Sequence, residues 1–232
     1  MCSPVNRVET QVSSNEPRMQ AYYAARATEY DDVYSKPERQ SDLRSIQEWL
    51  PSHFFYATVL EVACGTGYWT QFIARTAARI VAIDTSLETI EIARRRVTTG
   101  NATFVAGDAY ALPLGAGAFN AAFAGFWFSH VPKAKRQEFL RGLHSRLAPG
   151  APVILIDNLY VDGSSTPIAE TDTDGNTYQT RHLRDGSIHR VLKNFPSEPE
   201  LRSCLGELGT MCTFRASTYF WAFTYAASTR AP

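Results

Sequence analysis

Short runs of hydrophobic residues alternate with stretches of helical periodicity through the middle of the chain. The hydrophobic runs lie at residues 58–62, 80–83, 103–105, 120–123 and 152–156. Between and after them, helical patterns occupy residues 69–77, 86–97 and 132–147. Short apolar strands separated by helices predict an α/β fold with a doubly wound parallel sheet that carries helices on both faces.

The two ends of the chain have a different pattern. Residues 1–17 are polar and predict a flexible tail, whereas residues 18–50 are helical in period and predict a cap. Near the other end, Ser197-Glu-Pro-Glu200 is a capping box that opens a last helix, and strands are expected at 212–216 and 220–225. We therefore expect a single domain from residue 18 to the end.

A polar insertion, residues 158–196, follows the fifth hydrophobic run. Asp185-Gly186 is a strong signal for a two-residue turn, which predicts a hairpin that folds over the domain like a lid. Such a turn would place His182 opposite His189. This pair has no evident third ligand, so we expect no metal site.

Composition narrows the function. The 232 residues carry 23 Lys and Arg against 23 Asp and Glu, and 44% are hydrophobic. The hydrophobic share excludes a disordered chain. The zero net charge disfavours nucleic acid as a partner, because proteins that bind it through phosphates are usually basic. The N-terminus lacks a secretory h-region, no apolar run is long enough to span a membrane, and the four cysteines are scattered. We expect a reduced, cytoplasmic location.

The most informative segment is a glycine loop at the end of the first strand, with Gly65 and Gly67 before a helix. Glycines let the backbone approach a ligand closely, and the helix start adds unpaired N–H groups. The third glycine of a dinucleotide fingerprint is replaced by Thr70, and Glu61 lies within the strand. A carboxylate would repel a pyrophosphate, which disfavours NAD or FAD, but it would attract an ammonium or sulfonium group.

Acidic residues mark the ends of three successive strands. Glu61 lies in the first, Asp84 ends the second and Asp108 follows the third. An acid at the end of the second strand is typical of folds that hold ribose hydroxyls, and Asp108 is placed to accept from an adenine amino group. Each acid alone is more often a solvated loop residue, but the three together, after one glycine loop, indicate a nucleoside site.

Four motifs resemble class I S-adenosylmethionine (SAM)-dependent methyltransferases. They are E-V-A-C-G-T-G at 61–67, V-A-I-D at 81–84, G-D-A-x-x-L-P at 107–113 and L-A-P-G-A-P-V-I-L-I-D at 147–157. The resemblance covers about residues 20–230 and is nearest to the small-molecule branch that includes menaquinone and ubiquinone methyltransferases. It implies a Rossmann-like sheet of seven strands, the last of them antiparallel.

The resemblance also implies which residues hold the cofactor, SAM. Glu61 and the loop backbone would surround its methionine end, Asp84 its ribose and Asp108 its adenine, while tyrosines of the N-terminal cap would close over it. The implied set is Tyr22, Tyr30, Glu61, Ala63, Gly65, Thr66, Gly67, Asp84, Thr85, Asp108, Ala109 and Gly125.

The acceptor is expected beside the segment after the fourth strand, where open α/β sheets bind substrates. His130 is the candidate general base, since the pKa of histidine lies near neutrality; its alternative role is a helix cap. The other candidates for acceptor contact are aromatic, or carry a polar or cationic end. They are Phe126, Trp127, Asn158, Tyr160 and Arg181. Core packing is the alternative role of the aromatic residues.

These observations predict an enzyme that transfers a methyl group from SAM to a small-molecule acceptor. The loop after the fourth strand lacks the Asn- or Asp-Pro-Pro-aromatic motif of enzymes that methylate nucleic-acid amines. Two alternatives stay open: a nicotinamide-dependent oxidoreductase, and a non-catalytic SAM-binding domain that binds a protein partner. We expect a monomer or homodimer without a membrane or nucleic-acid partner.

Overall fold

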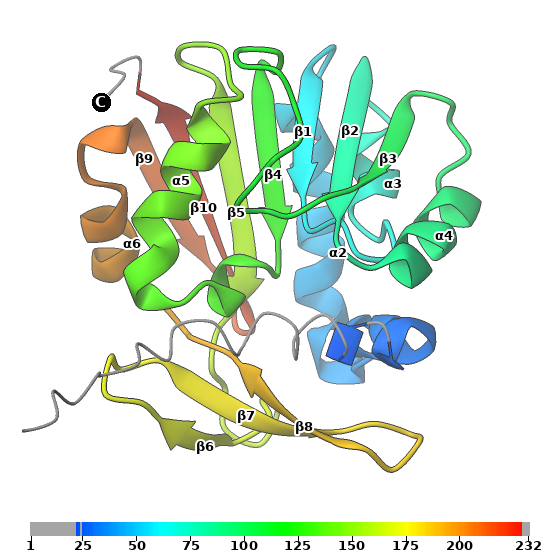
Figure 1. Cartoon of the computed structure of the whole chain (residues 1–232), viewed down its shortest axis with the longest axis vertical. Helices are drawn as coiled ribbons and strands as arrows, with labels where there is room; N and C mark the ends of the chain where they lie inside the picture. Colours follow the sequence, from blue (N-terminus) through cyan, green and yellow to red (C-terminus); the bar gives the residue numbers. More distant parts are fainter. Residues whose placement is uncertain (1–21, 24, 229–232) are drawn as a thin grey trace, which may run out of the picture.

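The computed structural model describes residues 22–23 and 25–228. The predicted tail at residues 1–17, and part of the predicted first helix, lie outside these residues. A large sheet of seven strands forms the centre of the described chain, in the order β3-β2-β1-β4-β5-β10-β9 (Figure 1). The strands are β1 (Thr58–Val62), β2 (Arg79–Asp84), β3 (Ala102–Ala106), β4 (Ala121–Gly125), β5 (Pro152–Asn158), β9 (Gly209–Ala216) and β10 (Phe220–Ala227).

The strand directions confirm the predicted fold class. Strands β1 to β5 pair in parallel, whereas β10 runs antiparallel to both of its neighbours, β5 and β9. Parallel strands end at one edge of a sheet, so the loops after β1, β2, β3, β4 and β5 meet there. In Figure 1 this edge faces downward, toward a smaller sheet.

Helices cover both faces of the large sheet. One hydrophobic cluster packs α2 (Gln40–Trp49), α3 (Thr70–Ile73) and α4 (Leu87–Arg96) against the sheet, and a second packs α5 (Arg136–His144) and α6 (Glu198–Leu205) against the other face. Alternate residues of each strand supply the two clusters, because successive side chains point to opposite faces. None of the helices in the described residues has the length and apolar character needed to cross a membrane.

Local signals explain where the helices begin. The Ser86 side chain accepts from the backbone amide of Thr89 and caps α4, and the predicted capping box of Ser197 and Glu200 is present at α6. Two helices are shorter than predicted. The 69–77 pattern gives only the four residues of α3, and the 132–147 pattern begins as a 3₁₀ turn, so that α5 starts at Arg136.

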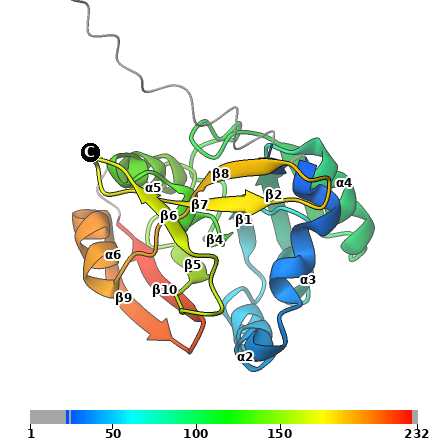
Figure 2. The same cartoon turned by 90° about the horizontal axis from the view of Figure 1, so that it is seen from below.

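The N-terminal segment is less regular than an α-helix. After residues 22–26 it continues as the 3₁₀ helices η1 (Ala27–Tyr34) and η2 (Pro37–Arg39) before α2, and η3 (Leu50–His53) follows α2. The remaining 3₁₀ turns are η4 (Phe128–His130), η5 (Lys133–Lys135) and η6 (Gly206–Leu208). The segment lies at the carboxyl edge of the large sheet, as the two views show (Figures 1 and 2).

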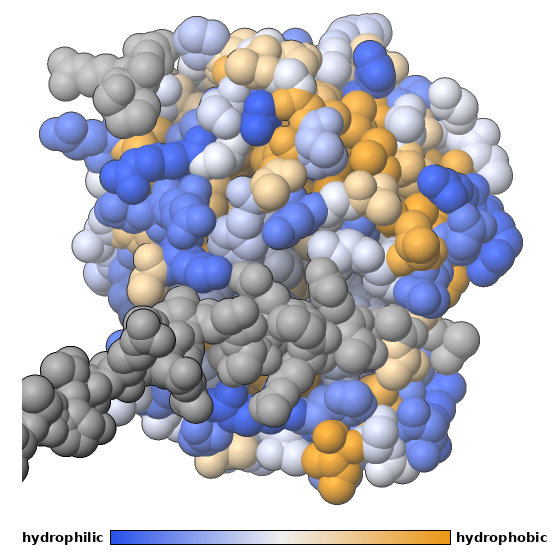
Figure 3. Space-filling model, viewed as in Figure 1, coloured by the Kyte–Doolittle hydropathy of each residue, from blue (hydrophilic) through white to orange (hydrophobic). Residues whose placement is uncertain are grey.

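The insertion forms a second, antiparallel sheet in the order β6 (Ile168–Thr171), β7 (Thr177–His182), β8 (Ile188–Leu192). It lies across the carboxyl edge of the large sheet (Figure 2). The edge of the insertion that is visible in Figure 3 has hydrophilic residues with a few hydrophobic ones among them, and all four residues of β6 are exposed. The hairpin was predicted from the sequence, whereas β6 was not, because an exposed strand shows no hydrophobic alternation.

The predicted register of the hairpin was wrong by one residue. Leu183 and Ser187 close a three-residue turn, in which the Leu183 carbonyl accepts from the Gly186 amide and Gly186 has a φ of +85°. This turn pairs His182 with Ile188 and Arg181 with His189, so the two histidines are not opposite each other. A three-residue turn with glycine in the left-handed region adds one residue to the loop and shifts every later pair.

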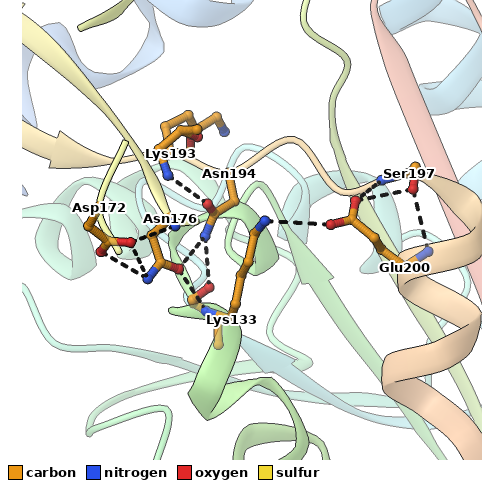
Figure 4. A network of polar contacts seen from close by, with 9 residues as sticks. Lys133, Asp172, Asn176, Lys193, Asn194, Ser197 and Glu200 are labelled. Atoms are coloured by element: carbon orange, nitrogen blue, oxygen red, sulfur yellow. Dashed lines mark hydrogen bonds and ion pairs between the residues drawn. The ribbon is translucent and has the colours of Figure 1, made fainter. Parts of the chain in front are cut away.

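Polar contacts fix the second sheet to the first (Figure 4). Asn176 Oδ1 accepts from the Lys133 amide at 2.8 Å and from Asn194 Nδ2 at 3.2 Å. The Lys133 ammonium is 3.6 Å from a carboxylate oxygen of Glu200 on α6, and Asn194 donates its backbone N–H to the Ser129 carbonyl. The base of the insertion is therefore tied to the loop after β4, and Lys133 of that loop is in turn paired with α6.

Candidate cofactor and acceptor sites

The glycine loop follows β1 and has an unusual backbone. Ala63, Gly65 and Gly67 all have positive φ, at +56°, +52° and +71°. A Cβ at Gly65 would lie 2.8 Å from the Tyr30 ring, and one at Gly67 would lie 3.1 Å from the Cα of Ala93 on α4. Both conformation and space therefore require glycine at these two positions. The Tyr30 ring lies against the loop at Gly65.

Asp84 organises the loop from the end of β2. Its Oδ2 accepts from the Gly65 amide at 2.8 Å, and its Oδ1 accepts from the Ser86 amide at 2.9 Å. Burial raises the pKa of Asp84, and these hydrogen bonds oppose that rise. The carboxylate therefore lies beside the glycine loop at the start of α4.

Thr66 connects the loop to the N-terminal cap. Its hydroxyl donates to Asp31 Oδ1 at 2.6 Å and accepts from Arg96 Nη1 at 2.9 Å, and Arg96 also forms an ion pair with Asp31. Thr66 is 1% exposed. The last arginine of α4 thus holds the cap against the loop.

A cavity of about 530 Å³ lies between the loop and the ends of β2, β3 and β4. Six residues predicted to bind the cofactor line it: Tyr30, Ala63, Asp84, Thr85, Asp108 and Ala109. Tyr23, another tyrosine of the N-terminal cap, also lines it. Ile83, Thr89 and Gly107 line it and were missed; the sequence signal for Gly107 was its place in the G-D-A motif. Glu61, Gly65, Thr66, Gly67 and Gly125 do not line the cavity and lie behind its wall.

Gly125 is one of the residues behind the wall. A Cβ there would lie 2.9 Å from the rings of Trp69 and Phe123, so close packing accounts for the glycine. The next residue, Phe126, has a φ of +57° and lines the cavity, as Ala63 does. Non-glycine residues in this conformation are strained, and such strain gathers at functional sites. Here it marks the ends of two neighbouring strands, β1 and β4.

Glu61 is a buried carboxyl group without a counter-charge. It is 1% exposed, lies between Ala82 of β2 and Phe123 of β4, and its Oε2 has no hydrogen-bond partner. Burial raises the pKa of Glu61 to about 8, and the nearby charge of Asp84 adds to the effect. A cationic ligand at this sheet edge would favour the charged form, so the site fits a ligand with an ammonium or sulfonium group.

A second cavity, of about 800 Å³, adjoins the first. Tyr23, Tyr30 and Phe126 line both cavities and therefore form their common wall. Of the residues predicted to contact the acceptor, Phe126, Asn158 and Arg181 line the second cavity, as His130 does, whereas Trp127 lines the first. Tyr22, predicted to bind the cofactor, also lines the second.

Tyr160 lines neither of these two cavities. It is 40% exposed and its ring lies 5.2 Å from that of Phe195. Its place two residues beyond the end of β5 turns it away from the sheet edge, so the structure does not bring it together with the other candidates. Arg26 and Lys36 also line this second cavity and were missed.

His130 has a defined tautomer. Its Nδ1 lies 2.6 Å from the Leu192 carbonyl oxygen, which accepts hydrogen bonds only, so Nδ1 carries the proton and Nε2 keeps its lone pair. Burial lowers the pKa of His130, and the Lys193 ammonium lowers it further. The ring is therefore neutral at pH 7, with one basic nitrogen, and it lies edge-on to Tyr23.

Comparisons with known proteins agree with this geometry. Residues 59–150 match a family model described as a methyltransferase domain. The structure of DhpI in complex with SAH shares 30% sequence identity and a TM-score of 0.75, over 92% of this chain and 97% of that chain. A complex of DhpI with SAM and a ligand named HEP shares 30% sequence identity and a TM-score of 0.74. This match covers 90% of this chain and 96% of that chain.

Curated relatives match over shorter segments. An uncharacterised methyltransferase of Synechocystis sp. is 31% identical over 99 residues, which is 43% of this chain and 46% of that protein. The demethylmenaquinone methyltransferase of Lactococcus lactis is 26% identical over 151 residues, 62% of this chain and 59% of that protein. The chain thus spans about half of the length of these two relatives. Together with the sheet order and the glycine loop, the match to DhpI over nearly its whole length places the chain in the family of SAM-dependent methyltransferases.

Proposed function

We propose that this protein transfers a methyl group from SAM to a small-molecule acceptor by in-line displacement. The observation that carries the proposal is the pair of adjoining cavities with Tyr23, Tyr30 and Phe126 as their common wall. One cavity has the glycine loop and Asp84, and the other has His130. This arrangement suits a donor held against an acceptor, which is the main requirement for methyl transfer.

The first cavity has the groups that SAM requires. Asp84 would hold the ribose hydroxyls, Thr85 would lie beside the adenine, and Asp108 and Ala109 would meet the adenine edge. The backbone from Ala63 to Gly67 would surround the methionine end, with Gly125 near it, and Tyr22 and Tyr30 would belong to the cap. Burial raises the pKa of the Glu61 carboxyl to about 8, and a bound cationic ligand would favour its ionised form. When bound, SAM supplies the electrophilic methyl group.

His130 would act as the general base for an acceptor that arrives protonated. Its neutral ring offers Nε2 as the proton acceptor, and the Leu192 carbonyl holds the ring in place through Nδ1. Phe126 and Trp127 would exclude water from the reacting atoms, while Asn158 and Arg181 would position the acceptor. The insertion 158–196 and the cap 18–50 would act as the cover of both cavities.

Small-molecule chemistry is supported by the relatives and by the composition. Demethylmenaquinone methyltransferase is named for a small-molecule acceptor, and the DhpI structure with SAM also contains HEP. The zero net charge gives no basis for nucleic-acid binding. A cytoplasmic location and a monomeric or homodimeric state remain predictions.

Thermal unfolding tests the cofactor. SAH at 100 times its Kd stabilises a folded protein by about 2.7 kcal/mol, which for a chain of this length raises Tm by about 5–10 °C. We expect this rise with SAH, and none with NAD at the same concentration. An equal rise with NAD, or none with SAH at millimolar concentration, would refute the proposal in favour of another ligand.

Two substitutions separate cofactor binding from chemistry. Asp84→Asn is expected to raise the Kd for SAH about 10- to 100-fold, because charged hydrogen bonds to the ribose are lost. His130→Ala is expected to lower kcat about 100-fold with any acceptor that needs deprotonation, while the Kd for SAH changes less than threefold. Calorimetry measures the Kd for SAH, and the mass of the product formed from labelled SAM measures kcat. Equal, small losses in both variants would contradict these roles.

A further inference from the structure

The second cavity has more positive charge than the described part of the chain neutralises. Arg26, Lys36, Arg181 and Lys193 line it, and Asp32 is the single acidic residue in its lining. Asp32 already forms an ion pair with Arg184 at the tip of the hairpin. Lys193 is paired with Asp157, at 2.8 Å. Arg26, Lys36 and Arg181 therefore remain without a carboxylate partner among the described residues.

The two arginines that line the cavity come from different parts of the chain. Arg181 lies on β7, and its Nη2 donates to Gln179 Oε1 at 2.5 Å. Its Nε is buried and has no hydrogen-bond partner. Arg26 lies on the N-terminal cap, with its guanidinium 5.7 Å from the centre of the Tyr22 ring and 5.3 Å from that of Tyr30. Unpaired guanidinium groups in a partly buried site are costly unless an anion joins them.

A buried amide adds a further unused donor. Asn158 ends β5, is 7% exposed, and lines the same cavity. Its Nδ2 is buried without a hydrogen-bond partner. The cavity thus brings together two unused N–H donors and the cations around them, a combination that matches the oxygens of an acid group.

We propose that the acceptor is a small acid whose oxyanion, a carboxylate or phosphoryl group, is bound by Arg181 and Arg26, with the Asn158 amide as an additional donor. This inference rests on the proposed function, since it names the class of molecule that occupies the second cavity. An uncharged acceptor would leave the cationic cluster and both buried donors unsatisfied. Lys36, which donates to the Ser164 carbonyl of the insertion, adds positive potential at the far side.

The cofactor's own carboxylate is the competing explanation for these cations. Arg181 lines the second cavity and not the first, and the common wall lies between it and Asp84. Arg181 is therefore the residue whose replacement separates the two explanations. A role in cofactor binding would appear as a weaker affinity for SAH, whereas a role in acceptor binding leaves that affinity unchanged.

The test measures Tm of the full chain saturated with SAH while an anion is added. Inorganic phosphate is the probe for a phosphoryl group and acetate is the probe for a carboxylate, with chloride keeping the ionic strength constant. We expect both anions to raise Tm in the wild type. In Arg181→Gln, the apparent Kd for each anion should rise at least about tenfold, as expected for loss of a charged hydrogen bond. Arg190→Gln is the matched control, since Arg190 is exposed on the neighbouring strand and paired with Glu170; it should behave as the wild type.

The outcomes distinguish the two proposals. If SAH does not bind at all, the proposed function fails. If SAH binds but phosphate and acetate act alike on all three proteins, or if Arg181→Gln weakens SAH instead, the acid-acceptor proposal is overturned. Arg181→Gln should leave the Tm of the ligand-free protein unchanged or raise it, because it removes one of several like charges. Arg181→Lys keeps the charge and should recover part of the anion affinity. It replaces Arg181→Gln in the test if that variant does not fold.

Discussion

Asp157→Asn is expected to lower the free energy of unfolding by about 3 kcal/mol or more, whereas Lys193→Met should lower it by about 1 kcal/mol or less. The two side chains form a buried ion pair at 2.8 Å, with exposed fractions of 5% for Lys193 and 0% for Asp157. They join the end of β5 to the base of the insertion. Removing either side chain breaks the same ion pair. The two expected losses of stability differ because the remaining partner keeps different hydrogen bonds in each variant.

Asp157 keeps hydrogen bonds when Lys193 is removed. Its Oδ2 accepts from the Ser129 amide at 2.9 Å and its Oδ1 accepts from the Asn158 amide at 2.8 Å. Lys193, by contrast, keeps only the Ser129 hydroxyl, at 2.7 Å, when the carboxylate is replaced. A buried ammonium without a counter-charge is much more costly than a carboxylate that still accepts from two backbone amides.

Urea unfolding at pH 7 measures both variants, with Arg190→Gln as an exposed control that should change stability little. The pH dependence gives a second test. Burial lowers the pKa of Lys193, and loss of Asp157 should lower it further. The unfolded chain of Asp157→Asn then binds more protons than the folded chain, so the variant should regain stability as pH rises toward the ordinary lysine pKa, near 10.4. Equal losses in the two variants at pH 7 would contradict the asymmetry.

The strands and the glycine loop were predictable from sequence because local pattern determines them. The buried strands β1, β2 and β5 are continuous apolar runs, and Gly65 and Gly67 have positive φ, a local requirement of the turn. Six of the twelve residues predicted for the cofactor line the first cavity. Five of these six, all except Tyr30 of the cap, lie at or just after a strand end, where fold class determines the position.

The acceptor cavity was less predictable because distant segments build it. Arg26 comes from the cap, Arg181 and Lys193 from the insertion, and Asn158 from the end of β5. Sequence spacing does not show that such segments meet. Arg181 was among the residues predicted to contact the acceptor, whereas Arg26 was not predicted. The turn at Gly186 then shifted the register, since loop length depends on backbone conformation that the dipeptide Asp-Gly leaves open.

Glu61→Gln is expected to make the ligand-free protein more stable at pH 8 by about 3 kcal/mol or more, with little change at pH 5. Burial raises the pKa of Glu61 to about 8 in the folded chain, whereas a glutamate in an unfolded chain titrates near its ordinary value, about 4.3. Between these two values the folded state holds a proton that the unfolded state has released. The wild type therefore loses stability as pH rises through this window, and the loss levels off above about pH 8.

Glutamine has the shape of the protonated carboxyl group and does not ionise, so the variant should lack this loss of stability. Urea unfolding at pH 5, 6, 7, 8 and 9 measures it, with Glu91→Gln as control because Glu91 is an exposed residue of α4 paired with Arg94. Parallel stability curves for Glu61→Gln and the wild type would show that Glu61 is ionised in the folded chain at neutral pH. The expected result, converging curves at pH 5 and a growing separation up to pH 8, would mean that the protein stores an electrostatic cost at this position. A cationic ligand at the loop would offset that cost, so wild-type affinity for SAM should rise between pH 6 and 8 while that of Glu61→Gln stays level.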